Sequence, residues 1–63
     1  MIIPGNLVKY LWNDAIGLVK KVNNDRPCQS ALVVWPPTFA RECGVKHNQW
    51  WTPCDRYLLK VNR

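Results

Sequence analysis

Three cysteines and one histidine are the side chains of this 63-residue chain that could most readily do chemistry. Cys43 and His47 stand four residues apart, an offset that suits two ligands of one zinc ion. Zinc sites normally draw the other two ligands from a second close pair, whereas Cys28 and Cys54 each stand alone. We therefore expect three separate thiols, no metal site and no cofactor.

The same thiols could form a disulfide or act as nucleophiles. Cys43 and Cys54 flank a short predicted strand that could bring them together, but an odd cysteine count favours free thiols in a reducing compartment. Cys28 or Cys43 could pair with His47 as nucleophile and base. A chain this short has little room for a walled pocket with an oxyanion hole, so we do not expect a thiol enzyme.

Acid–base and nucleotide chemistry have no better support. The four acidic residues form no close pair of carboxylates, and no phosphate-binding or dinucleotide-binding glycine motif is present; the acids are Asp14, Asp25, Glu42 and Asp55. The sequence therefore predicts a protein that is not an enzyme.

The formal net charge is +5, from nine lysines and arginines against four acids. This balance favours a nucleic-acid or acidic-protein partner, although the basic residues are scattered and also fit a solvated basic surface. No apolar run approaches the roughly 18 residues of a membrane span. The first residues also lack a basic segment followed by an apolar one, so we expect neither secretion nor membrane insertion.

We expect one domain over residues 1–63, because the chain has no repeat, no low-complexity segment and no linker. A domain of this size buries only about 60% of the surface that its unfolded chain exposes. Hydrophobic residues make up 48% of the chain and include four tryptophans. These large side chains can supply most of a small core.

Short alternating apolar segments separated by turn residues predict an all-β fold. A short apolar arm at residues 1–4 precedes them, and polar turns are expected at residues 13–15 and 23–27. The five expected strands are residues 6–12, 16–22, 29–35, 49–52 and 57–61.

Three local features break this pattern. Gly17 inside the second strand predicts a bulge or bend. The longest loop covers residues 38–48, with room for a half-turn at residues 39–42 and with Gly44 available for a positive φ. A single helical turn is expected at residues 53–56, before the last strand.

The alternation also predicts which side chains form the core, although a shift of one residue would exchange the two faces of any strand. The expected core residues are Val8, Tyr10, Ile16, Val19, Val22, Leu32, Val34, one of Trp50 and Trp51, Leu59 and Val61.

Trp50 and Trp51 are neighbours in a predicted strand, so their side chains point to opposite faces. One of them must face outward, unless Phe39 or the loop at residues 38–48 covers it. An uncovered indole with basic neighbours could anchor a protein interface, stack on bases or help to cage a cationic group. The candidate partner-binding residues are Trp12, Arg41, Lys46, Trp50, Trp51, Arg56 and Tyr57.

Several short motifs occur in the order of an SH3-like small barrel. Residues 5–8 read Gly-Asn-Leu-Val, residues 17–19 read Gly-Leu-Val, and residues 33–36 read Val-Val-Trp-Pro. Trp-Thr-Pro at residues 51–53 then leads into Leu-Leu-Lys-Val at residues 58–61. This set resembles the stand-alone SH3-like proteins encoded by tailed bacteriophages, and it is also similar to KOW-type domains.

The resemblance implies a five-stranded SH3-like barrel that acts as a non-catalytic interaction or structural module. Its partner would be a larger protein assembly, such as phage structural proteins in a virion, or further copies of the chain. Its location would be the virion or the host cytoplasm. The similarity to KOW-type domains implies the alternative, a nucleic-acid-binding module that uses basic and aromatic surface residues.

Overall fold

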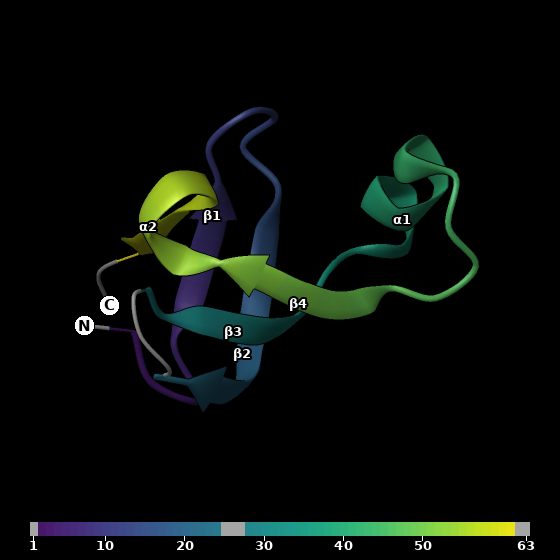
Figure 1. The fold of residues 1–63 in the computed structure, drawn as a ribbon. Coiled ribbons are helices and arrows are strands. Elements are labelled where there is room, and N and C mark those ends of the chain that lie inside the picture. The colour runs from purple at the N-terminus through teal and green to yellow at the C-terminus, as the bar shows by residue number, and fades with distance from the viewer. Residues whose placement is uncertain (1, 25–27, 62–63) are drawn as a thin grey trace.

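Five strands and two short helices build the computed structural model, which describes residues 2–24 and 28–61. The helices interrupt the strands only after the third and fourth strands, so the prediction of a mostly β fold with five strands is confirmed (Figure 1). In chain order the elements are β1 (Leu7–Tyr10), β2 (Ile16–Asn23), β3 (Ser30–Val34), α1 (Pro37–Cys43), β4 (Gln49–Pro53), α2 (Cys54–Tyr57) and β5 (Leu58–Val61).

The strands form one antiparallel sheet in the order β4-β3-β2-β1-β5. β2 is the longest strand, at eight residues, and lies at the centre of the sheet. β4 and β5 are the two edges, and the sheet is not closed between them. The structure therefore shows the five-stranded antiparallel sheet that we expected, but not a closed barrel.

The register of β3 differs by one residue from our prediction. Ala31, Val33 and Trp35 point into the core, whereas Leu32 and Val34 are only partly buried on the opposite face. Trp35, at the end of the strand, is only 1% exposed. Because side chains alternate with a period of two, burying this large indole also turns Val33 and Ala31 inward.

Our prediction of the buried face was also wrong by one residue for β5 and for the start of β2. Leu58 is buried opposite Tyr10, while the predicted core residue Leu59 is exposed and Val61 is half-buried. Ile16 is exposed because the next residue, Gly17, faces the interior. The other predicted core residues of β1 and β2 are buried, or pack against the buried cluster, as expected: Val8, Tyr10, Val19 and Val22.

Gly17 makes close packing between β2 and β3 possible. A Cβ atom at this position would lie 2.7 Å from Cε3 of Trp35 and would also collide with Cγ1 of Val33. The irregularity that we expected at Gly17 lies instead between Val19 and Lys21, where the pairing of β2 with β3 shifts. The glycine is therefore required for a close approach, and not for a bulge.

Aromatic rings form a connected cluster within the core. Phe39 of α1 contacts Tyr10 and Trp35 with ring centroids 5.0 Å apart in each case, and it lies 5.4 Å from Trp50. Tyr10 also packs on Trp35 at 5.7 Å and stacks on Tyr57 at 5.9 Å. These rings pack directly against one another, so they do not surround a hole that could hold a cationic group.

The helix α1 replaces most of the loop that we expected at residues 38–48. Pro37 occupies the first turn, where a missing N–H costs nothing, and Gly44 ends the helix with a φ of 74°. The positive φ predicted for Gly44 is therefore confirmed. In the described part of the chain, neither helix is long or apolar enough to cross a membrane.

The N-terminal arm belongs to the fold. Ile2 is buried in the core, and its carbonyl oxygen accepts a hydrogen bond from Nε2 of Gln29 at 2.9 Å. Residue 1 of the expected arm and residues 25–27 of the expected turn at residues 23–27 lie outside the described residues.

Candidate functional site

The cysteines and the histidine do not form one site. In residues 2–24 and 28–61, no group of three or more histidine, cysteine or acidic side chains is placed to hold a metal ion. All three cysteines are free thiols; Cys28 and Cys43 are exposed, whereas Cys54 is buried. The ring Nδ1 of His47 lies 2.9 Å from the carbonyl oxygen of Gln49, so its nearest polar partner is backbone and not a thiol.

Cys54 is the most enclosed of these groups. Burial raises the pKa of its thiol, and the nearby Asp55 and Cys28 add to the increase. A raised pKa keeps the sulfur protonated and therefore weakly nucleophilic at neutral pH. Burial likewise raises the pKa of Tyr10, with smaller contributions from Tyr57 and Cys43. Neither shift creates an activated nucleophile or base.

Trp50 and Trp51 lie on opposite faces of β4, as the sequence predicts. Trp50 is the inner residue and packs against Phe39 and Trp35, with ring centroids 5.4 Å and 6.1 Å apart. Trp51 is 49% exposed on the outer face. Trp51 is therefore available to a partner, whereas Trp50 is largely committed to the core.

The other predicted site residues lie in the β1–β2 turn and around two pockets, and the turn contacts α2 because the Leu11 N–H donates to the Tyr57 oxygen at 2.9 Å. Trp12 is 76% exposed in the turn between β1 and β2. Arg56 and Tyr57 of α2 line a pocket of about 370 Å³ together with Cys28. The structure therefore does not gather the predicted residues into one aromatic patch with a basic rim.

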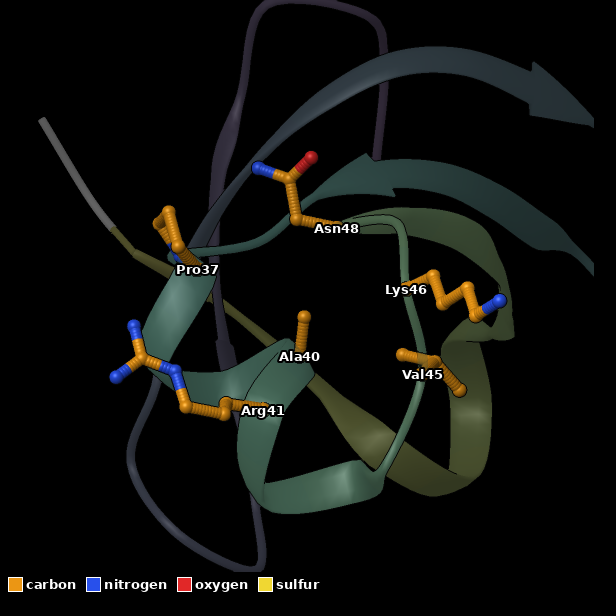
Figure 2. A pocket seen from close by; sticks show the side chains of 6 residues that line it. All are labelled: Pro37, Ala40, Arg41, Val45, Lys46 and Asn48. Atoms are coloured by element: carbon orange, nitrogen blue, oxygen red, sulfur yellow. The ribbon is translucent and has the colours of Figure 1, made fainter.

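Arg41 and Lys46 line a shallow pocket of about 320 Å³ between α1 and the segment that leads to β4. Figure 2 shows the guanidinium of Arg41 and the ammonium of Lys46 on opposite sides of this pocket, directed away from each other. The two cations therefore do not converge on one position where an anion could bind.

The outer face of the sheet carries an apolar surface that the sequence analysis missed. The register pairs Val34 with Leu18, Leu18 with Leu7, and Leu7 with Val61, so one apolar row crosses β3, β2, β1 and β5. Most of its neighbours on the same face are also apolar, and the exceptions include Lys9 and Lys21. We call this surface the outer face and define it by Leu7, Ile16, Leu18, Leu32, Val34, Trp51, Leu59 and Val61.

Several of these side chains are strongly exposed, including Leu18 at 45% and Leu59 at 52%. Leu59 and Val61 were assigned to the core by the alternation, as were Leu32 and Val34. A sequence in which both alternating positions of a strand are apolar carries a signal for this surface, because only one set can enter a small core.

Two lysines lie on the outer face, one on each side of the apolar row. Lys9 pairs with both Ile16 and Leu59, and Lys21 pairs with Leu32, which in turn pairs with Trp51. The ammonium of Lys9 lies 3.6 Å from a carboxylate oxygen of Asp14, and both side chains are solvent-accessible, so this ion pair is weak. The apolar row thus has Lys9 on one side and Lys21 on the other.

The chain matches no protein-family model, no curated protein and no solved structure.

Proposed function

We propose that this chain is a non-catalytic interaction module that docks on a larger protein assembly through its outer face. The observation that carries the proposal is the continuous apolar row across four strands, flanked by the exposed Trp51. Soluble domains seldom leave contiguous apolar surface uncovered unless a partner binds there. Tryptophan is also among the residues that most often anchor protein interfaces.

The charges around the outer face indicate the chemistry of the partner. Lys9 and Lys21, on the two sides of the apolar row, would meet acidic groups, while the row itself would meet apolar side chains. The partner surface is therefore apolar at its centre and acidic at its edge.

The resemblance to SH3-like proteins indicates what kind of assembly the chain would bind. The strand order β4-β3-β2-β1-β5, with a helical turn before the last strand, agrees with an SH3-like barrel. This order supports our proposal that the fold is SH3-like, and the likeness of the motifs to the stand-alone SH3-like proteins of tailed bacteriophages supports our proposal that the assembly is a virion.

The test uses two glutamate substitutions at leucines of similar exposure. Leu18→Glu places a charge in the apolar row, whereas Leu11→Glu places the same charge in the β1–β2 turn, where Leu11 is 49% exposed. In extracts of the native source, the wild-type chain and the Leu11→Glu chain should sediment with a particle much larger than one chain. The Leu18→Glu chain should stay with free protein; wild-type protein found only there would overturn the proposal.

A second candidate function is nucleic-acid binding by a KOW-like module. The observation that favours it is the cross-strand row Trp51–Leu32–Lys21, which places a cation and an exposed indole on one face. Such a binder neutralises phosphates and loses affinity steeply as salt rises. Fluorescence titration with single-stranded DNA and RNA at about 50 and 200 mM salt tests this. Binding that is absent at the lower salt removes the candidate.

A further inference from the structure

β4 is an edge strand, and two hydrogen bonds fix which way its backbone groups point. At one end of the β3–β4 ladder, the Trp35 N–H donates to the Asn48 oxygen at 2.7 Å. At the other end, the Cys54 N–H donates to the Gln29 oxygen at 2.9 Å. In an antiparallel ladder, hydrogen-bonded pairs alternate with pairs that are not hydrogen-bonded. These two bonds therefore set the pattern for every residue between them.

The alternation divides the backbone of β4 into two sets. Trp50 and Thr52 direct their N–H and C=O groups toward β3, and Gln49, Trp51 and Pro53 direct theirs toward the free edge. Edge strands of soluble proteins are usually protected by a charged side chain. β4 has no charged residue, and its protection is limited to its short length and to Pro53 at its end.

We propose that two copies of this chain associate by antiparallel pairing of their β4 strands about a twofold axis at Trp51. Trp51 is the middle residue of β4, so this register pairs it with Trp51 of the second copy. Each Trp51 N–H donates to the other Trp51 oxygen, and each Gln49 N–H donates to the Pro53 oxygen of the second copy. Pairing edge to edge in this way continues the sheet across both molecules.

In this register one backbone hydrogen bond cannot form between the two copies, but the oxygen concerned already has a partner in its own chain. Pro53 has no N–H to donate to the Gln49 oxygen of the other strand. The ring Nδ1 of His47 already lies 2.9 Å from that oxygen within the same chain. Every backbone group along the shared edge therefore has a partner, which a strand of arbitrary sequence would not guarantee.

This symmetry also places one acidic residue near the basic end of the second strand. Lys46 and His47 precede the strand, and Asp55 follows it, with Arg56 one residue further on in α2. Antiparallel pairing brings the basic end of each strand to the end of the other strand that Asp55 follows. The exposed indoles of the two Trp51 residues then lie side by side on the joined outer faces. This association does not depend on the proposed docking function, because its bonds lie at the sheet edge.

A matched pair of variants at Trp51 tests the ladder. Trp51→Pro removes the indole and the N–H that faces the free edge, without removing a bond to β3. Trp51→Thr removes the indole but keeps the N–H. In sedimentation from about 1 µM to 1 mM, the wild-type mass should rise from 7.4 kDa toward twice that value. The dissociation constant of Trp51→Pro should exceed that of Trp51→Thr by roughly tenfold or more.

The wild-type protein provides a test that does not depend on the folding of a variant. In this register, the Hα atoms of Trp50 and of Thr52 in the second copy face each other across the new pair. A mixture of labelled and unlabelled chains should therefore give an intermolecular nuclear Overhauser effect between them. A mass of one chain at every concentration, equal dimerisation of folded Trp51→Pro and Trp51→Thr, or a dimer without this Overhauser effect would each overturn the proposal.

Discussion

At the scale of single residues, Gly17 determines how closely β2 approaches β3. The space above it is occupied by Val33 and Trp35, which are both fully buried. A single methyl group there has nowhere to go without moving one of these side chains. The absence of a side chain at position 17 therefore allows the indole of Trp35, the largest fully buried side chain, to pack against β2.

We predict that Gly17→Ala lowers the free energy of unfolding by about 1–3 kcal/mol, because it overpacks the core between two strands. The matched control is Leu18→Ala, at an exposed neighbour whose side chain leaves the core unchanged, and it should cost less than about 1 kcal/mol. Urea denaturation of both variants measures the difference. An equal loss of unfolding free energy in the two variants would contradict the close contact of Gly17 with Val33 and Trp35.

We predict that the buried thiol of Cys54 makes the free energy of unfolding depend on pH. Burial, with Asp55 and Cys28, raises the pKa of this thiol in the folded chain. The native state therefore holds the proton more tightly than the unfolded state does. Its contribution is fully present below the pKa of an unfolded thiol, roughly 8.5, and is lost as the pH rises beyond it.

The free energy of unfolding should consequently fall between about pH 7 and pH 9.5 more steeply in the wild type than in Cys54→Ala. Urea denaturation at the two pH values measures the slopes. Tyr10, whose pKa is also raised, contributes in the same direction to both proteins and leaves a residual slope. Identical slopes in the two proteins would contradict the assignment of the effect to Cys54.

At the scale of elements, the helix α1 packs over the aromatic rings of the core. Its buried residues are Phe39 and Ala40, and Phe39 touches three of the core rings. A helix of seven residues has little stability of its own in water, so its formation depends on this contact. The element and the core therefore stabilise each other.

Phe39→Ala should lower the free energy of unfolding by about 3–5 kcal/mol, which is a large part of the stability of a domain this small. Thr38→Ala, at an exposed position of the same helix, should leave stability within about 0.5 kcal/mol of the wild type. Thermal unfolding followed by circular dichroism and tryptophan fluorescence measures both. A Phe39→Ala protein as stable as the control would mean that α1 is not part of the core.

The existence of the strands was predictable from the sequence, but the face that each strand buries was not. The opposite directions of Trp50 and Trp51 followed from the period of two, which holds in any strand. In β3, both alternating positions are apolar, so the pattern does not distinguish Val33 from Val34. In β5, Lys60 shares a face with Leu58, so the pattern favours Leu59 although the structure buries Leu58. Those choices depend on Trp35 and Tyr10, which are contacts between distant parts of the chain.

The candidate site shows the same limit. Exposure of one indole of the pair was predictable, whereas the companions of Trp51 were not. Arg41, Lys46, Arg56 and Tyr57 were grouped with it by sequence proximity, but the helices carry them to separate pockets. The actual neighbours on its face, Leu32 and Lys21, are set by the register of β2, β3 and β4.

At the scale of the whole molecule, one sheet serves two purposes. Its inner face packs on the core, and its outer face carries the apolar row through which we propose that a partner binds. The positive charge of the chain, +5, favours acidic groups on that partner. The free edge of β4 adds a route by which two such faces become one continuous surface.

Contact mapping by photo-crosslinking tests the docking function most directly. A photoreactive amino acid would replace Leu18, Leu59 or Leu11 one at a time, and the chain would be irradiated in its native source. Leu18 and Leu59 lie on the outer face, whereas Leu11 is equally exposed in the β1–β2 turn. We predict protein crosslinks from positions 18 and 59 and none from position 11. Crosslinks from position 11 alone, or to nucleic acid instead of protein, would contradict the account.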